Sequence, residues 1–167
     1  MSNVFQMDCK ANGIHWGGLL KALILPVPFN AVIWIRIFLW LEKHHLPTFL
    51  PFRWLYHIHG LEFARRIRIG GGLRIPHPHG ILFTEDMKIG ERVSIYGNVR
   101  FTRSYDKAPR IGNDVFIGDS TVFTGKSGIG NHCIVGAGSV VTKVFGDNVI
   151  IAGNPAGIIR EYPIEQK

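Results

Sequence analysis

Four histidines, His57, His59, His77 and His79, lie close together near the middle of the sequence. A neutral imidazole takes a proton from a hydroxyl group at neutral pH, and it is also the commonest side-chain ligand of transition metals. No cysteines or carboxylates accompany these histidines at the fixed spacing of a metal-ligand set. The sequence therefore predicts no metal site and leaves general-base chemistry as the role to be tested.

The elements that must position these histidines follow a six-residue repeat. Five units run without a break from Ile111 to Val140, each with a large apolar residue first and a small or β-branched residue fifth. The same period runs less cleanly through residues 69–86 and 89–106. Self-similarity at a fixed short period indicates a solenoid rather than an ordinary helix or sheet.

An apolar residue at every sixth place suits a chain that coils through short straight segments and corners, three segments to a turn. Gly, Asn and Asp follow the apolar residue, and we expect them to supply the positive φ angles of tight corners. Two stretches break the period. We expect Met87-Lys88 to be a surface insertion and the basic stretch Lys107–Arg110 to be a loop that walls a site.

The first sixty residues have a different pattern. Residues 19–25 and 29–41 are mainly apolar, but Pro26, Pro28 and Arg36 interrupt them, which disfavours a membrane-spanning helix. Asp8 disfavours a signal peptide. The pattern predicts a pair of short helices that pack on the coil, on a partner subunit or in a membrane interface. We therefore divide the chain into a helical segment, 1–60, and a coil domain, 61–167.

Composition limits the partners. The formal net charge is +7, but the positive residues are scattered, so the sequence predicts no nucleic-acid partner. Phosphorylated cofactors, acidic sugars or an anionic membrane surface explain the charge better. Two unrelated cysteines, Cys9 and Cys133, indicate a reducing compartment, and Cys133 stands at a small fifth position where we expect it to be buried.

Four stretches carry a resemblance to a known family: residues 69–81, 111–118, 135–141 and 152–156. The chain resembles the hexapeptide-repeat acyltransferases of the serine acetyltransferase-like branch, and most of all capsule and exopolysaccharide O-acetyltransferases. The resemblance implies an all-β repeat fold, a left-handed parallel β-helix of about five coils with a short α-helical N-terminal segment. It also implies a homotrimer with active sites between neighbouring subunits.

The resemblance assigns catalytic roles. The family pattern His-x-x-Gly-Ile falls on His77, which is then the general base, and Glu62 stands where similar enzymes have an acid that orients it. Glu62 as an ordinary surface acid beside Arg65 remains the alternative. The remaining residues expected to bind the acceptor are His79 and, on the loop of a neighbouring subunit, Arg103, Tyr105 and Lys107.

The co-substrate implied by the resemblance is acetyl-CoA. A groove of small residues suits the long, thin pantetheine chain, and basic residues suit the nucleotide phosphates. Each glycine, taken alone, is also explained by the coil. The residues expected to bind acetyl-CoA are Asp119, Ser120, Gly136, Ala137, Gly138, Lys143, Pro155 and Arg160.

Two departures bear on the acceptor. Serine acetyltransferases carry an acid before the catalytic histidine and an Arg-His pair in the following loop, where this chain has Pro76 and Lys107-Ala108. We therefore expect O-acetylation of a sugar hydroxyl of a surface polysaccharide or its precursor. Serine O-acetylation, N-acetylation of an amino sugar and a non-enzymatic rod are the alternatives. We expect a cytoplasmic protein that contacts the inner face of the membrane through residues 19–56.

Overall fold

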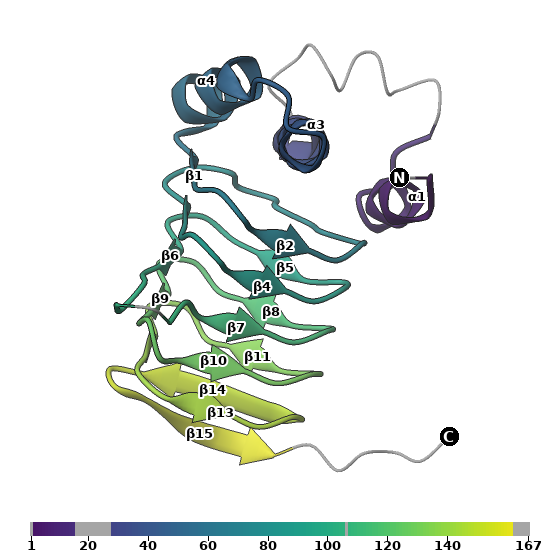
Figure 1. The fold of residues 1–167 in the computed structure, drawn as a ribbon. Coiled ribbons are helices and arrows are strands. Elements are labelled where there is room, and N and C mark those ends of the chain that lie inside the picture. Colours follow the sequence, from purple (N-terminus) through teal and green to yellow (C-terminus); the bar gives the residue numbers. More distant parts are fainter. Residues whose placement is uncertain (1, 16–27, 106, 162–167) are drawn as a thin grey trace.

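The computed structural model describes residues 2–15, 28–105 and 107–161 of the 167-residue chain. Within these ranges three helices come first, α1 (Ser2–Ala11), α3 (Pro28–Lys43) and α4 (Phe49–His59). Short strands follow and wind into a rod, with the helices gathered at the end where the winding begins (Figure 1). The predicted fold class is confirmed as a parallel β-solenoid of about five coils, consistent with a left-handed β-helix of hexapeptide repeats, with a short helical segment.

Three sheets of five strands each form the sides of the rod. Sheet A holds β1 (Glu62–Phe63), β3 (Leu82–Phe83), β6 (Arg100–Phe101), β9 (Val122–Phe123) and β12 (Val140–Val141). Sheet B holds β2 (Arg68–Ile69), β4 (Lys88–Ile89), β7 (Arg110–Ile111), β10 (Gly128–Ile129) and β13 (Val144–Phe145). Sheet C holds β5 (Ser94–Ile95), β8 (Phe116–Ile117), β11 (Ile134–Val135), β14 (Val149–Gly153) and β15 (Ala156–Glu161). All pairs are parallel except β14 and β15, which close the rod as an antiparallel hairpin.

The chain turns at three corners in every coil. The asparagine corner joins sheet B to sheet C through residues 70–72, 90–92, 112–114, 130–132 and 146–148. The histidine corner joins sheet C to sheet A through residues 76–80, 96–98, 118–120 and 136–138. The loop corner joins sheet A to sheet B through residues 64–66, 84–86, 102–109 and 124–126.

Glycines serve these corners through close approach. A Cβ added to Gly112 would stand 2.5 Å from the backbone of Gly130 on the next coil. The positive φ angles come later in the unit, at Arg92, Asp114 and His132, with φ of 54°, 55° and 55°. The prediction that Gly, Asn and Asp supply the positive φ angles is therefore confirmed at Asp114 and Asn148 of the asparagine corner, but not at Gly112, the glycine that follows the apolar residue. That glycine is needed because two backbones touch there.

The interior is a stack of mainly apolar side chains from the first and fifth positions of the repeat, so that most sides of a coil bury two of them, as at Val93 and Ile95. In sheet A four buried phenylalanines, Phe63, Phe83, Phe101 and Phe123, follow one another with ring centroids 5.2, 5.6 and 5.2 Å apart. Each buried phenylalanine contributes about 2 kcal/mol or more. Cys133 is 1% exposed, which confirms the predicted packing role of its position.

The two interruptions of the repeat differ in structure. Met87 is fully buried and Lys88 lies in β4, so the prediction that this pair is a surface insertion is wrong. The longer coil is accommodated at the histidine corner, which takes residues 76–80 in this coil and only three residues, such as 96–98, in later ones. The second interruption does form a loop, because Ser104 and Lys107 exchange backbone hydrogen bonds of 3.1 and 3.0 Å across a tight turn. Asp106 lies outside the described residues.

A buried ion pair fastens the helices to the first coil. Asp8 of α1 is fully buried and accepts hydrogen bonds from the Nε atom of Arg36 at 2.7 Å and from the backbone N–H of Leu73 at 2.9 Å. Arg36 of α3 also donates to the carbonyl of Ile69 at 2.8 Å. Removing one partner of such a pair leaves a buried charge. Asp8 and Arg36, which interrupt the apolar pattern of the sequence, therefore hold the two helices on the first coil. Helix α1 itself was not predicted from the sequence.

His59 has a structural environment. It is 1% exposed at the end of α4, with its Nε2 atom 2.7 Å from Oδ1 of Asn30. Burial, with a smaller effect of His79, lowers the pKa of His59 to about 4. This histidine is therefore neutral near pH 7. The part of the chain that the structure describes contains no cluster of three or more metal-ligating side chains.

No helix among the described residues is long and apolar enough to cross a membrane. Residues 19–27 of the segment expected to contact lipid lie outside the described residues. α3 packs on the rod, where Phe38 meets the ring of Phe63 with centroids 5.1 Å apart. The predicted packing of short helices on the coil is confirmed for α3.

Candidate active site

His77 lies on the histidine corner of the first coil, the coil on which the helices pack, and its side chain is exposed to solvent. Its ring faces Tyr96 on the next coil, with centroids 5.8 Å apart at 56°. Tyr96 in turn contacts Phe116 one coil further, with centroids 5.0 Å apart. Tyr96 was not predicted from the sequence, where its signal is no more than that it follows the apolar residue Ile95 one coil below His77. An accessible imidazole thus stands beside an aromatic wall.

Glu62 lies on the coil before His77, on the same side of the rod. It begins β1, pairs in register with Leu82, and donates its backbone N–H to Ile81 at 3.0 Å. Leu82 follows the His77–Gly80 turn directly, so the carboxylate lies next to the histidine corner. Within the described ranges its side chain is exposed and no hydrogen bond joins it to His77.

His79 shares the turn of His77. Its backbone N–H donates to the carbonyl of His77 at 2.9 Å, and its own carbonyl accepts from Asn98 at 2.8 Å. These bonds fix the turn to the coil below. The imidazole of His79 is close enough to the buried His59 to contribute to the lowered pKa of His59. Both imidazoles of the His-Pro-His stretch are exposed.

Below His77 the corner carries small residues. A Cβ on Gly97 would stand 2.9 Å from Oδ1 of Asp119 and 3.2 Å from the carbonyl oxygen of His77, so these three residues stack on successive coils. Ser120 donates to the carbonyl of Gly97 at 3.0 Å, and Gly138 to that of Asp119 at 2.8 Å. Side-chain hydroxyls of Thr121 and Ser139 turn inward to corner carbonyls. The result is a track of small residues along one edge of the rod.

The predicted acetyl-CoA residues divide into two groups. Asp119, Ser120, Gly136, Ala137 and Gly138 all lie on this track. Pro155 lies at its lower end, because Ala152, just before it, is the neighbour of Gly136 on the next coil.

Two predicted phosphate contacts lie away from the track. Arg160 lies in β15 at the edge of sheet C, in register with Ile150. Lys143 lies at the opposite end of the sheet A strands from the track, with its Nζ 5.3 Å from the ring centre of Phe145. Within one subunit, therefore, the track and Lys143 do not form one surface.

The predicted acceptor-binding loop is also separated from His77. Arg103 forms ion pairs with Glu85 at 2.9 Å and Asp86 at 3.2 Å, and Tyr105 is 94% exposed. Both residues, like the exposed Lys107, lie on the loop corner, at the far end of the sheet A strands from His77. The described residues of a single chain therefore do not bring this loop to the histidine.

The two departures from the serine acetyltransferase pattern have clear positions. Pro76 precedes His77 on the histidine corner and is partly buried. Ala108 lies on the loop corner, where its side chain packs against the core rather than facing solvent. At both positions a polar side chain of the pattern is replaced by an apolar one.

Comparison with known proteins agrees with this geometry. Residues 108–143 match the family "Bacterial transferase hexapeptide (six repeats)". The chain is 31% identical over 126 residues to serine acetyltransferase 2 of Arabidopsis thaliana, covering 73% of this chain and 39% of the relative. It is 47% identical over 51 residues to galactoside O-acetyltransferase of Escherichia coli strain K12, covering 30% of this chain and 25% of that protein.

Among solved structures, serine acetyltransferase of Brucella abortus strain S19 in complex with coenzyme A superposes with a TM-score of 0.81. The identity is 27%, and the match covers 97% of this chain and 68% of that one. The chain carries hexapeptide repeats and is similar in sequence and fold to serine acetyltransferases. It spans about two fifths of the Arabidopsis relative, since that match covers 39% of the relative's length. The predicted resemblance is thus confirmed at the level of the serine acetyltransferase type, and the capsule and exopolysaccharide branch is not supported.

Proposed function

We propose that the protein is an acetyl-CoA-dependent O-acetyltransferase that uses the histidine corner as its active site. The observation that carries the proposal is the exposed imidazole of His77 at the head of a track of small residues. An edge without bulky side chains suits an extended amide chain, and the imidazole at its end suits a general base. The Brucella relative, which superposes over nearly the whole chain, was solved with coenzyme A.

In the proposed reaction His77 removes the proton of the acceptor hydroxyl as its oxygen bonds to the thioester carbonyl carbon. The C–S bond then breaks, and the proton passes from the imidazolium to the departing sulfur, which leaves as the free thiol of coenzyme A. Such proton transfer contributes about 10²- to 10⁴-fold to the rate. Rotation of the Glu62 side chain toward His77 would orient the ring and stabilise the imidazolium.

L-Serine is the acceptor that the relatives favour. The Arabidopsis protein and the Brucella protein are both serine acetyltransferases by name. A purified sample incubated with acetyl-CoA and L-serine should release coenzyme A, measured by a thiol reagent. Release that is equal with and without serine excludes serine as the acceptor and leaves the acetyl-CoA half of the proposal standing.

A sugar hydroxyl is the second candidate acceptor, and Pro76 and Ala108 favour it. Neither side chain can bind the charged groups of an amino acid, because one is a ring and the other a methyl group facing the core. The match to a galactoside O-acetyltransferase points the same way. The same thiol assay with a panel of glycosides, sugar nucleotides and amino sugars tests this candidate and the N-acetylation alternative together.

We also propose a homotrimer, as hexapeptide acyltransferases generally form. The outer faces beside the histidine corner carry exposed apolar side chains, with Phe116 38% and Ile134 36% exposed on sheet C and Leu82 partly exposed on sheet A between the charged Glu62 and Arg100. Packing these faces against neighbours would bring the loop with Arg103, Tyr105 and Lys107 to another subunit's His77. Light scattering on the eluting protein measures the mass, and a monomer at micromolar concentration contradicts the proposal.

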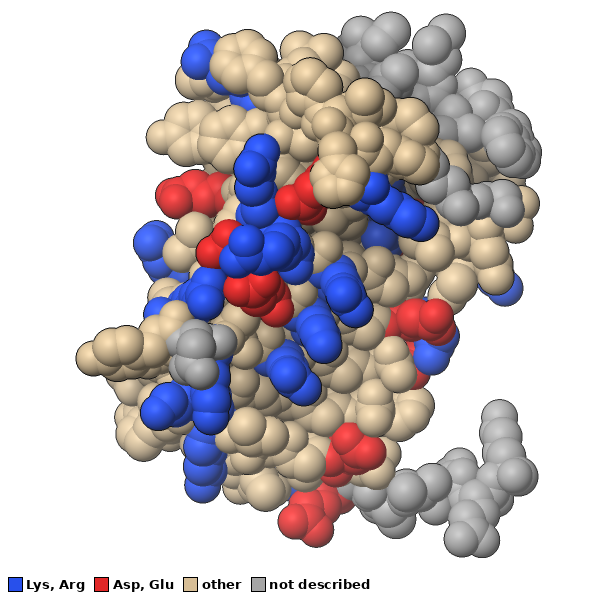
Figure 2. All heavy atoms as spheres, in the orientation of Figure 1, with Lys and Arg blue, Asp and Glu red and all other residues tan. Residues whose placement is uncertain are grey.

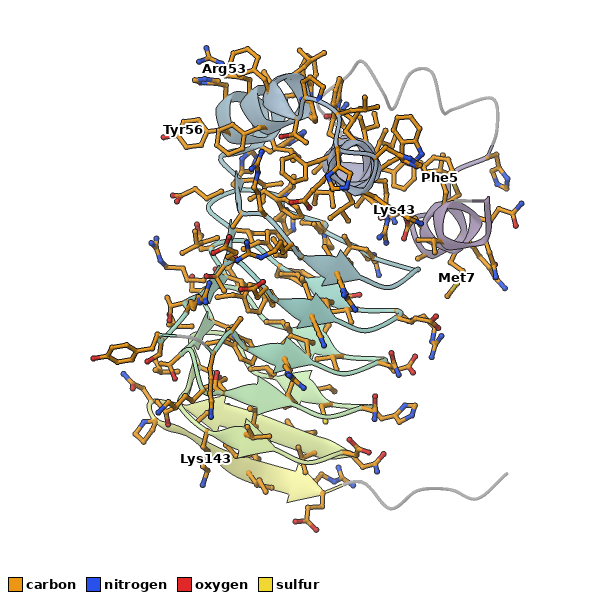
Figure 3. The ribbon with its side chains drawn as sticks, viewed as in Figure 1. Phe5, Met7, Lys43, Arg53, Tyr56 and Lys143 are labelled. Atoms are coloured by element: carbon orange, nitrogen blue, oxygen red, sulfur yellow. The ribbon has the colours of Figure 1, made fainter. Side chains whose placement is uncertain are left out.

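Contact with a membrane remains a proposal for α4. Phe49, Leu50, Phe52 and Tyr56 are 70%, 65%, 40% and 49% exposed, and Arg53 lies among them (Figure 3). An exposed helix face of this composition suits the boundary of an anionic bilayer. The protein would then act in the cytoplasm at the inner face of the membrane. Sedimentation with vesicles of phosphatidylglycerol tests it, and Phe49→Ser with Leu50→Ser should abolish the binding.

A further inference from the structure

Three positive side chains form a ladder on the outer face of sheet B. Arg68, Lys88 and Arg110 are exposed and pair in register on adjacent strands. At the usual strand separation the ladder spans about 10 Å. Figure 2 shows Lys and Arg side chains in a diagonal column across this face, between two groups that contain acidic residues. The neighbours further along sheet B, Gly128 and Val144, are uncharged, so the ladder has a defined length.

Within the described ranges no ion pair joins the ladder to an acid, although two acids, Glu42 and Asp86, line the groove that its upper end enters. Asp86 pairs with Arg66 at 2.7 Å, and Glu91 pairs with Arg92 at 2.9 Å. Glu42 accepts a hydrogen bond from the backbone of Arg66 at 3.0 Å. Like charges on adjacent strands repel one another, so the stack costs stability as it stands. A bound anion would remove that cost.

The upper end of the ladder enters a groove of about 930 Å³ between sheet B and helices α1 and α3. Arg68 and Lys88 lie on one side of it, and Lys43 of α3 adds a third positive charge. The wall opposite is apolar, formed by Val4, Phe5, Leu39 and Trp40. Trp40 is 39% exposed, which leaves part of its ring accessible, and Arg36 in the groove is already neutralised by Asp8.

This groove is separate from the proposed active site. The histidine corner joins sheets C and A, so it is the vertex of the triangular coil that lies opposite sheet B. A ligand on the ladder therefore cannot touch His77 of the same subunit. The groove is instead bounded by the helices, on the side of the rod that carries the ladder.

We propose that this groove binds a ligand bearing a diphosphate group. The phosphate oxygens contact Arg68, Lys88 and Lys43, and an attached ring or apolar chain lies against Trp40. Phosphate is favoured over an acidic polymer because the charged stretch covers three strands only, and because Arg and Lys side chains bind phosphate oxygens well. A nucleoside diphosphate and an isoprenoid diphosphate share this chemistry, and the experiment separates them.

Titration calorimetry at about 0.15 M ionic strength, where the screening length is about 8 Å, tests the proposal with four probes: inorganic pyrophosphate, uridine diphosphate, farnesyl diphosphate and uridine. The three diphosphates should bind, and uridine should not. Lys88→Glu should weaken pyrophosphate binding by about tenfold or more, since it replaces attraction by repulsion at contact distance. Lys126→Glu, the same charge change at an exposed position of the loop corner, should leave it within about twofold, since charges further apart than a screening length interact weakly.

Trp40→Ala separates the sources of the diphosphate. It should weaken whichever of uridine diphosphate and farnesyl diphosphate packs on the ring, and leave pyrophosphate unchanged. Equal loss of binding in Lys88→Glu and Lys126→Glu, or unchanged binding in Lys88→Glu, overturns the proposal. Because coenzyme A also contains a diphosphate, its binding is measured in parallel. Lys88→Glu should retain it, so failure of this groove and failure of the proposed acetyl transfer are distinguishable.

Discussion

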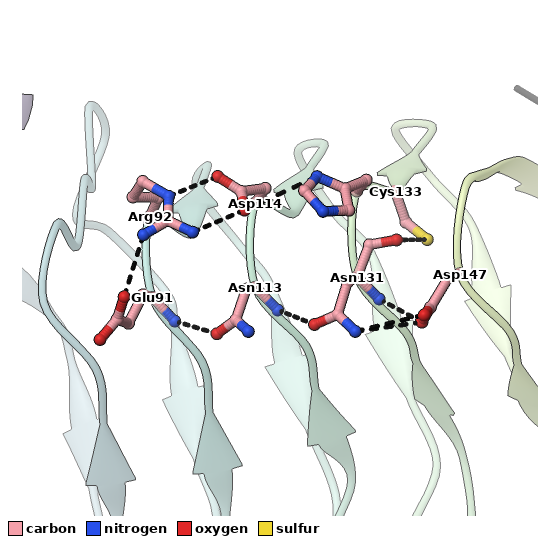
Figure 4. Close-up of polar contacts among 8 residues, drawn as sticks. Glu91, Arg92, Asn113, Asp114, Asn131, Cys133 and Asp147 are labelled. Carbon is pink, nitrogen blue, oxygen red and sulfur yellow. Dashed lines mark hydrogen bonds and ion pairs between the residues drawn. The ribbon is translucent and has the colours of Figure 1, made fainter. Parts of the chain in front are cut away.

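The asparagine corner and the histidine corner arise from the same repeat and lie in the same coils, yet side chains cover only one of them. At the asparagine corner the Oδ1 atoms of Asn113, Asn131 and Asp147 each accept the backbone N–H of the coil before, at 2.8, 2.8 and 2.7 Å (Figure 4). Arg92 adds a two-point contact to Asp114 at 2.6 and 2.8 Å. At the histidine corner the corresponding positions, apart from Tyr96 beside His77, are glycines, an alanine and short polar residues. One edge is held together by side-chain hydrogen bonds, and the other is the edge on which we propose that coenzyme A binds.

Replacing a histidine at each corner gives the largest expected difference. His77→Ala should lower kcat/KM for acetyl transfer by about 10²- to 10⁴-fold, because the hydroxyl loses its base. His132→Ala removes an exposed imidazole from the asparagine corner and should leave kcat/KM unchanged. Steady-state kinetics by thiol release measures both. Equal activity of the two variants would show that the histidine corner is not the reaction site.

Glycine replacements test the role of close approach. Gly112→Ala should lower the free energy of unfolding by about 2 kcal/mol or more, because its Cβ would stand 2.5 Å from the backbone of Gly130. Gly146 has the same place in the last coil with nothing within 4 Å of an added Cβ, so Gly146→Ala should be nearly neutral. Denaturant unfolding of both variants decides the matter. A large loss in Gly146→Ala would instead indicate a backbone-angle requirement.

The pH dependence of stability tests the helical end of the rod separately from the two corners. The pKa of His59 is lowered to about 4, so the unfolded state binds more protons than the native state between pH 6.5 and about 4. The free energy of unfolding should therefore decrease by about 1–3 kcal/mol as the pH is lowered from 6.5 to about 4. His59→Gln should flatten this part of the profile. A profile of unchanged steepness in His59→Gln would assign the loss to other groups.

Deleting one polar side chain at each corner should affect different properties. Asn113→Ala should lower the free energy of unfolding by about 1 kcal/mol, because the N–H of Glu91 loses its partner. Its KM for acetyl-CoA should stay the same. Asp119→Ala should raise that KM by about tenfold, the equivalent of one hydrogen bond, and leave stability unchanged. A crossed result, with Asn113→Ala raising KM, would contradict the division of labour between the corners.

The smallest effect is expected for the stability that the Asp147 carboxylate gives the asparagine corner at acid pH. The backbone N–H of Asn131 holds the pKa of Asp147 below its ordinary 3.8, so the contact is complete above that pH and is lost as pH falls through the lower native value. Asp147→Asn retains an acceptor oxygen and no longer titrates. Its thermal midpoint should depend less on pH below about 4 than that of the parent protein. An identical dependence in both proteins would remove the carboxylate from the account.

Much of the fold could be predicted from spacing, because each coil makes its main contacts with the next and the repeat therefore carries its own packing rule. The apolar residues at Ile111, Ile117, Phe123 and their successors specify sides and corners without reference to distant sequence. Asp8 and Arg36 could not be read this way, since two residues 28 apart meet only when α1 and α3 dock on the first coil. The same holds for Met87, whose burial depends on how the longer coil is accommodated.

The residues of the candidate site also differ in whether the repeat predicts where they lie. His77 and the small residues of the track share one repeat position on successive coils, so a local rule brings them together. Lys143, Arg103 and Tyr105 belong to other corners, and no period in the sequence indicates on which side of the rod they face a ligand. Tyr96 was missed because an aromatic residue after the apolar position has no distinct signal until its ring is seen beside His77.

The sequence by itself determined the repeat, the three-sided coil and the buried stack of apolar side chains. It also determined the edge of the rod that carries an exposed histidine above small residues. These properties depend on contacts between neighbouring coils, which a fixed period encodes. Only the tertiary structure decided which charged residues are buried partners and which remain unpaired. Asp8 and Arg36 neutralise each other under the helices, whereas Arg68, Lys88 and Arg110 stack unneutralised on sheet B, because charge pairing depends on where separate elements meet in space.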